Sequence, residues 1–431
     1  MVPGSRVTGE LSPHPMRGWL LGPLIAWLLA GSTGRLAAED GESRLPYRSQ
    51  PIAYFETTSN PVATLQRQID DGLSELTVPI TLPRLLEALQ ISESSQLLVF
   101  ARNARQSHQI SPANPRAIYF NDEVSVAWTP GGPNLEISAI DPARGPVFYL
   151  APVDRSASTE RANSDGETTA ERQPWFRRSE SCLACHVAEA TRQVPGYLLR
   201  SMFTSPDGKP ESGLPLVDHT TPYERRWGGW YVTGARLPTR HRGNLTTRAS
   251  RQMFEATETA VVVGETELPA ATRRHLQGTS DVVALLVHDH QTRFQTLLTR
   301  LRYESLLNRP LDTLPGFVRT LLLWDEPALP GPVVGRADYQ AWFESAGPEA
   351  FRPLRQLDLK NRLLRHPLSW LVSTPQFQTL PVELRQAIHT EATRLVAAGR
   401  ETPTRLPEDE RRWLLDELLP RFVAPAEPDN R

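Results

Sequence analysis

The two cysteines of this 431-residue chain lie in a single pentapeptide, Cys182-Leu-Ala-Cys185-His186. Two intervening residues place both thiols on one turn of backbone, where each can bond to a vinyl group at the same edge of a porphyrin. The adjacent imidazole of His186 can then face the iron. A Cys-x-x-Cys-His sequence therefore predicts one covalently attached c-type haem, with His186 as the proximal metal ligand. If two cysteines and ten histidines were placed at random, the pattern would arise about once in ten thousand such chains.

Two other uses of paired cysteines fit the sequence less well. A structural zinc site needs four ligands, commonly including a second Cys or His pair, and the remaining histidines show no such spacing. A thioredoxin-like redox pair is expected between a strand and a helix of a βαβ unit, whereas Pro174 and a polar segment precede this motif. The sequence favours haem over both, and both stay open as alternatives.

The residue on the other side of the iron would decide between electron transfer and ligand chemistry, because a second strong ligand closes the metal. In the helix expected over residues 281–307, at about 100° per residue, His290 lies on the apolar stripe and His288 is turned about 160° away. We therefore expect His290 as the leading sixth ligand and His288 to be exposed to solvent. A histidine on an apolar stripe is also often a core residue held by a backbone group, and this alternative stays open. The further candidates are His219 and His241, followed by Met202 and Met253.

Residues 225–234, RRWGGWYVTG, combine aromatic rings with glycines and two arginines. Rings beside glycines can lie against a flat macrocycle, and a guanidinium binds a carboxylate through two parallel hydrogen bonds. The segment therefore predicts that Trp227 contacts the haem and that Arg225 or Arg226 pairs with a haem propionate. The alternative is a strand with core aromatics and surface arginines.

Residues 18–34 are uncharged and mostly apolar, follow Arg17 and precede small residues that end at Ala38. This pattern is typical of a secretory signal peptide, and it is short for a membrane span, which needs about 20 apolar residues. We expect a signal peptide over residues 1–38, no membrane span after its cleavage, and a mature protein in the periplasm or otherwise outside the cytoplasm. An uncleaved anchor is the alternative. Haem is attached to cysteine in exported proteins, so the signal peptide and the motif support each other.

Short strand and helix patterns surround the motif. Five β-branched or aromatic runs separated by turn sequences predict an antiparallel sheet. They cover residues 95–101, 117–121, 124–129, 135–140 and 146–151. Helical patterns precede the sheet at 61–76 and 82–91, and others follow at 281–307, with Ser280 as N-cap, and at 381–398. The fold class is α+β, with an antiparallel β-rich N-terminal region, a covalent haem segment and a mainly α-helical C-terminal half.

These elements divide the chain into five regions. They are a signal peptide (1–38), a β-rich domain with two short helices (39–153), a flexible loop (154–172), a haem-attachment region (173–279) and a helical region (280–425). The loop is expected because residues 154–172 contain almost no large apolar group to offset the entropy of ordering. Because the motif follows a sheet, we expect the haem to pack between the β-rich region and the long helix.

The composition excludes several classes of function. Hydrophobic residues make up 39% and charged residues 22% of the chain, as in globular proteins. The formal net charge of -2 provides no overall attraction for nucleic acid. Only Lys209 and Lys360 among the 47 basic residues are lysines, so catalysis by a lysine amine is not expected.

Several short runs accompany the haem motif over most of the mature chain. They are residues 120–122 (FND), 136–141 (EISAID), 194–196 (VPG), 218–222 (DHTTP), 226–234 (RWGGWYVTG), 241–244 (HRGN), 280–285 (SDVVAL) and 290–291 (HQ). Together they resemble a largely uncharacterised family of exported bacterial single-haem cytochrome c domain proteins. The resemblance implies haem binding and electron transfer and names no substrate. One departure is Ala235-Arg236, where similar sequences often carry a histidine, which argues against an iron ligand from that position.

The sequence therefore predicts a c-type cytochrome that transfers one electron at a time through a single haem, with a protein as its redox partner. The alternative is a haem enzyme acting on a peroxide or a small nitrogen compound at an open sixth iron position, where Asp218 and His219 could act as acid or base. Whether the protein is an enzyme is left open. A third hypothesis is a protein that senses a gas, but the sequence shows no apparent output domain.

Overall fold

The computed structural model describes residues 45–74, 76, 80–153, 175–211, 215–238, 240–257, 268, 274–398 and 406–424. The chain divides into Met1–Glu42 and a compact unit, Ser43–Arg431, to which all described residues belong. The predicted signal peptide at 1–38 and the predicted loop at 154–172 lie outside the described residues. No helix in the described part of the chain is both long enough and apolar enough to cross a membrane.

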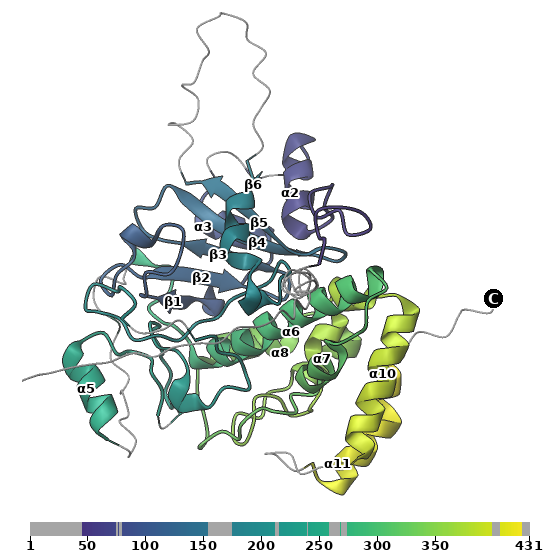
Figure 1. Cartoon of the computed structure of the whole chain (residues 1–431). Coiled ribbons are helices and arrows are strands. Elements are labelled where there is room, and N and C mark those ends of the chain that lie inside the picture. Colours follow the sequence, from purple (N-terminus) through teal and green to yellow (C-terminus); the bar gives the residue numbers. More distant parts are fainter. Residues whose placement is uncertain are drawn as a thin grey trace, which may run out of the picture. The chain divides into compact units, whose positions relative to one another are not determined.

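The N-terminal half is built on a six-stranded antiparallel sheet in which each strand pairs with the next along the chain (Figure 1). The strands are β1 (Leu97–Val99), β2 (Arg116–Phe120), β3 (Val124–Trp128), β4 (Asn134–Asp141), β5 (Gly145–Pro152) and β6 (Arg177–Arg178). The five predicted runs are β1 to β5, so the predicted sheet is confirmed. The sixth strand is a two-residue edge strand that pairs with β5 just before the Cys-x-x-Cys-His motif.

Local side-chain chemistry closes the hairpins. Asn121 Oδ1 accepts hydrogen bonds from the backbone N–H groups of Glu123 and Val124, which forms the β2–β3 turn. Asp141 Oδ1 accepts from the N–H groups of the next turn in the same way. Gly145 begins β5 with a φ of 74°, a conformation that favours glycine. Asn, Asp and Gly at these positions are the signals from which the turns were predicted.

One face of the sheet packs against the two N-terminal helices, α2 (Pro61–Asp70) and α3 (Leu82–Ala88). Alternate strand residues, among them Tyr119, Val126 and Ile137, share a core with the buried apolar residues of these helices. Both helices end before the predicted limits of 76 and 91. Gly72 follows α2 with a φ of 70°, which a helix cannot continue.

The opposite face packs against α6 (Val282–Leu306), the central helix of the molecule, which Figure 1 shows between the sheet and helices α7 and α8. The N-cap of α6 is Asp281, whose Oδ1 accepts from the N–H groups of Val283 and Ala284 at 3.0 and 3.1 Å. The predicted N-cap, Ser280, is therefore wrong by one residue. Its hydroxyl instead donates to Tyr231 O at 2.7 Å, so it is not available to the helix.

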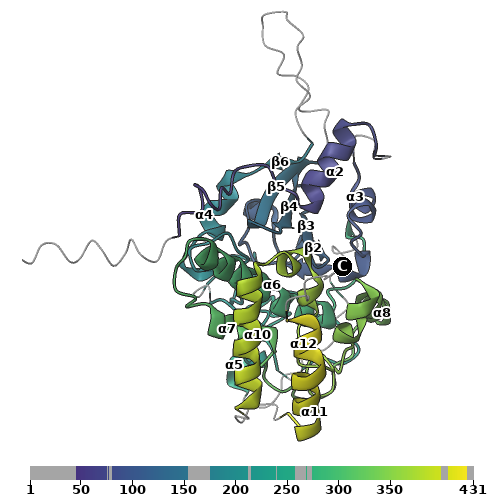
Figure 2. The same ribbon diagram turned by 90° about the vertical axis from the view of Figure 1, so that its right-hand side faces the viewer.

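Helices dominate the C-terminal half, as predicted, and Figure 2 shows α10 beside α12. These helices are α7 (Leu314–Leu321), α8 (Ala337–Ser345), α9 (Pro375–Gln378), α10 (Val382–Ala397), α11 (Glu408–Trp413) and α12 (Leu419–Phe422). Helix α10 confirms the pattern at 381–398. Two further helices, α4 (Leu183–His186) and α5 (Arg248–Ala256), lie between the sheet and α6 in the sequence. The α+β class and the order of its sheet and helices are thus as expected.

Short helical turns connect the elements. They are 3-10 turns at Glu93–Ser95, Ser107–Gln109, Glu180–Cys182, Glu189–Thr191, Tyr223–Arg225, Glu349–Arg355 and Trp370–Ser373, and a π turn at Leu414–Leu418.

Candidate cofactor site

Two consecutive turns present the residues of the Cys-x-x-Cys-His motif. The 3-10 turn Glu180–Cys182 runs directly into the single helical turn of α4. Leu183 is buried in the same core as the inner face of the sheet and anchors this segment. Cys182 is half-buried and Cys185 is exposed, and both thiols are free. Burial raises the pKa of the Cys182 thiol, so it stays protonated at neutral pH.

The imidazole of His186 is held by a hydrogen bond from Nδ1 to the carbonyl oxygen of Gly196, at 2.8 Å. A carbonyl only accepts hydrogen bonds, so Nδ1 carries the proton and Nε2 keeps a free lone pair. A metal-binding histidine is commonly oriented in this way. Burial lowers the pKa of His186, which favours the neutral form that binds metals. The ring also lies against Phe148 of β5, with 4.4 Å between ring centroids.

Gly196 is fixed against α6. A Cβ atom at this position would lie 2.7 Å from Thr296 Cγ2, closer than real Cβ contacts allow, and 3.0 Å from Thr191 Cβ. The N–H of the next residue, Tyr197, donates to Thr296 Oγ1 at 2.9 Å. The carbonyl that orients His186 is therefore positioned by the central helix.

A cavity of about 400 Å³ is lined by Cys182, Cys185 and His186 together. This is within the size range of about 300–1,000 Å³ for small-molecule sites. It lies between the outer sheet face and α6, where the sequence predicted the haem to pack. The outer sheet face contributes Arg116, Ile118, Ser125, Ala127, Ser138 and Phe148, and α6 contributes His288 and Thr292.

The strand register explains why the outer sheet face leaves this space. Phe148, Ser138, Ser125 and Phe120 are direct neighbours on β5, β4, β3 and β2, and so form one row across the sheet. The two central members of the row are small. Both serines line the cavity, between the two phenylalanines at the ends of the row. A ligand that enters beside the motif can therefore lie over Ser125 and Ser138.

Charged residues lie at the side of the cavity near the motif. Arg116 and Glu136, also on the outer face, form an ion pair of 2.7 Å. Arg105 Nη1 donates to the hydroxyl of Ser181, the residue before Cys182. All four side chains line the cavity.

His288 lines the cavity and is buried, with 7% of its surface exposed. The prediction that it faces solvent is wrong, because α6 is covered on one side by the sheet and on the other by the C-terminal helices. Its ring packs against Phe120, with 4.8 Å between centroids. Its Nδ1 has no hydrogen-bond partner among the described residues. Burial lowers the pKa of His288 to about 4.

His290 points away from the cavity, since two residues along a helix turn the side chain by about 200°. Its Nε2 lies 2.8 Å from Ser369 Oγ, and its ring contacts those of His219 and Trp370. The structure therefore does not bring His290 to the cavity as a metal ligand. It is a buried core histidine, as in the alternative, although its partner is the Ser369 side chain and not a backbone group. His219 lies beside it, away from the cavity as well.

Of the remaining sixth-ligand candidates, His241 and Met253 do not line the cavity and Met202 does. His241 Nδ1 accepts from the Gly243 N–H, and the His241 ring packs against Trp227. Met253 is 55% exposed on α5. Met202 is the one that lines the cavity, and it is 2% exposed.

Arg226 and Trp227 do not lie at the cavity either. Arg226 Nη1 and Trp227 Nε1 both donate to Asp289 Oδ2 of α6, each at 3.1 Å. Arg226 is 1% exposed and Asp289 fully buried, so the arginine neutralises a core carboxylate. The predicted contacts of this arginine and tryptophan with a haem are thus not supported by their placement. From the same segment, Trp230 does line the cavity.

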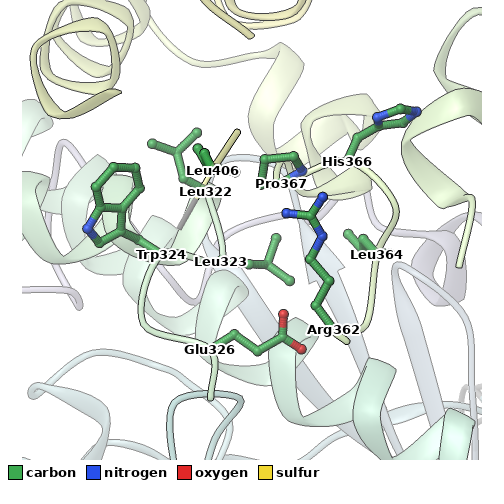
Figure 3. Close-up of a pocket in the computed structure, with 9 residues that line it drawn as sticks. All are labelled: Leu322, Leu323, Trp324, Glu326, Arg362, Leu364, His366, Pro367 and Leu406. Carbon is green, nitrogen blue, oxygen red and sulfur yellow. The ribbon is translucent and has the colours of Figure 1, made fainter. Parts of the chain in front are cut away.

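A second, smaller cavity lies between residues 322–326 and 362–367 (Figure 3). Its volume of about 10 Å³ is room for roughly one water molecule. The carboxylate of Glu326 at its edge accepts from the N–H of Leu363 at 3.0 Å, and burial raises the pKa of Glu326 to about 7. This space is too small for a cofactor. Among the described residues, no group of three or more His, Cys, Asp and Glu side chains could hold a bare metal ion.

Comparison with known proteins adds no relative: no family model, no curated protein and no solved structure matches this chain. The function is therefore argued from the chemistry of the site.

Proposed function

We propose that the mature protein is an exported c-type cytochrome that holds one haem through Cys182 and Cys185 and transfers single electrons. His186 would be the proximal ligand of its iron. The observation that carries this proposal is that both thiols and the His186 imidazole line one cavity, and that the Gly196 carbonyl leaves His186 Nε2 free to bind a metal. The predicted signal peptide and the family resemblance of the sequence favour the same function.

The two thiols are chemically suited to form thioethers. Each cysteine Sγ would add across one vinyl double bond, forming an S–C bond to the inner carbon while the thiol proton goes to the outer carbon. The addition consumes no oxidant and releases no atom. The bound group would supply an iron centre that alternates between the ferric and ferrous states.

The protein would bury part of this group against apolar side chains. Phe148 supports the proximal ring, and α6 fixes the carbonyl that orients it. Ile118, Ala127 and Leu199 add apolar surface to the cavity. Such burial is one of the means by which a protein sets the redox potential of a haem.

The motif itself marks the surface through which electrons would pass. Cys185 is exposed, as are Ser181 and Ala184 beside it. The thioether edge of a haem attached here would therefore be the part nearest to solvent. We place the docking surface for a redox partner protein around residues 181–185.

The direct test is expression of the full chain in a host that attaches haem c, followed by denaturing electrophoresis and peroxidase staining. The stain should coincide with the chain, and the pyridine spectrum should be that of a haem with saturated vinyl groups. The Cys182→Ala/Cys185→Ala variant should lose the stain. A wild-type band without stain, beside a stained control cytochrome from the same cells, would overturn the proposal.

A further inference from the structure

The cavity is lined by two histidines that come from different walls. His186 belongs to α4 and packs against Phe148 of β5, whereas His288 belongs to α6 and packs against Phe120 of β2. These phenylalanines end the cross-strand row defined above, three strand spacings apart. At about 4.8 Å per spacing, their backbones are separated by about 14 Å.

The space between the two phenylalanines is kept clear. Ser138 and Ser125 occupy the middle of the row and present the smallest polar side chains of this face. On α6, the cavity residue one turn after His288 is Thr292. Its hydroxyl donates back to the His288 carbonyl at 3.0 Å, so it takes no space from the imidazole. A flat group attached at the motif would therefore lie over these small side chains, in a cavity that both histidines border.

His288 is in the state that a metal ligand requires. Burial holds it neutral at physiological pH. Its Nδ1 is buried and lacks a partner within the described residues, although a buried polar atom without one costs about 1–3 kcal/mol. Because Nδ1 is enclosed, Nε2 is the nitrogen that this imidazole can present to the cavity, and a neutral imidazole can bind a metal through that nitrogen.

The competing side chains are less well placed. His219, His241 and His290 do not line the cavity, and one ring nitrogen each of His290 and His241 is hydrogen-bonded elsewhere. Met202 lines the cavity, but its backbone is held close to Gly228. The Met202 N–H donates to Gly228 O at 3.0 Å, and a Cβ on Gly228 would lie 2.6 Å from Met202 O. His186 and His288, by contrast, pack against Phe148 and Phe120, the residues at the two ends of the row.

We infer that His288 is the sixth ligand of the haem iron, opposite His186. This inference rests on the proposed function. Two imidazoles would give a low-spin iron closed to external ligands, with a lower potential than a His/Met pair. The site would then be that of an electron carrier, and the open iron of a haem enzyme would be excluded.

The test compares His288→Ala with two matched controls, His290→Gln on the same helix and Met202→Leu in the same cavity, each as the full chain matured with haem. Pyridine spectra first establish that every variant retains covalent haem. We expect low-spin ferric spectra and no CO adduct of the ferrous form for the wild type and both controls. His288→Ala should become high-spin and bind CO, and added imidazole should restore its low-spin bands.

Other results distinguish a failure of the His288 inference from a failure of the proposed function. Covalent haem with an unchanged low-spin spectrum in His288→Ala would refute the inference and leave the proposed function standing. A near-infrared band of iron–thioether ligation in the wild type, or a high-spin wild type, would refute it without any variant. Absence of covalent haem from the wild type would instead refute the proposed function.

Discussion

Replacing Arg226 by methionine should destabilise the protein without altering the proposed haem centre. The change removes a guanidinium that donates to Asp289 Oδ2, to His219 O and to Thr221 O. It leaves the carboxylate of Asp289 buried, with the Trp227 N–H as its one remaining side-chain partner among the described residues. Breaking a buried ion pair in this way costs about 3–5 kcal/mol. Arg225→Met is the matched control, because this neighbour is exposed and should change stability by less than about 0.5 kcal/mol.

The loss should depend on pH in a defined direction. Burial raises the pKa of Asp289 to about 7, and Arg226 opposes that rise. Without the arginine the carboxyl pKa rises further, so the folded variant holds its proton to higher pH than the wild type. A raised acid pKa favours the folded state at low pH, so the deficit should grow as the pH increases above 7.

Urea denaturation of the haem-loaded chain at pH 6 and pH 8.5 measures both effects, and a redox titration of the same samples measures the metal centre. The Arg226→Met/Asp289→Leu double variant should recover most of the stability, since it removes both charges. A stability loss no greater than that of Arg225→Met, together with a shifted redox potential, would refute the reasoning and favour a role for Arg226 at the haem.

Three further outcomes are expected. Gly196→Ala should cost about 1–3 kcal/mol by overpacking, and Thr296→Ser in the same chain should recover part of this by removing the methyl group 2.7 Å from the new Cβ; equal stability of single and double variants in thermal melts would contradict it. Burial lowers the pKa of His241 to about 4, so this residue takes up a proton at higher pH in the unfolded chain than in the folded one. Its contribution should lower the free energy of unfolding of the wild type by about 3 kcal/mol between pH 7 and pH 4. The His241→Asn variant should lack that loss. Urea denaturation at pH 7 and pH 4 in which wild type and variant lose the same stability would contradict this prediction. Asp281→Ala should lower stability by about 0.5–2 kcal/mol through loss of the α6 N-cap, and unchanged melting would count against that capping role.

The sequence predicts the sheet well because its signals are local. Asn121 and Gly145 close turns by their own chemistry, and the alternating runs between such turns specify strands. Neighbouring antiparallel strands joined by short turns pair in order. The motif residues Cys182, Cys185 and His186 were likewise predictable as a group, because two helical turns suffice to bring them together.

The surroundings of the motif depend on contacts that are distant in sequence. The sequence places Ser125 and Ser138 on strands but does not show that they are neighbours in one row, or that α6 and the motif enclose a cavity over them. The prediction that His288 is exposed assumed that one side of its helix faces solvent. Helix α6 is central and buried on both sides, so this assumption does not hold. Arg226 has the residue type of a carboxylate partner, and its actual partner, Asp289, is 63 positions away.

The intact mass of the denatured mature protein is the most direct test of covalent haem at Cys182 and Cys185. Thioether formation is an addition without loss of atoms, so the mass should exceed that of the polypeptide by one complete haem. The Cys182→Ala/Cys185→Ala variant should show the polypeptide alone. A wild-type mass equal to the bare polypeptide, from cells that mature a control cytochrome c, would contradict the account.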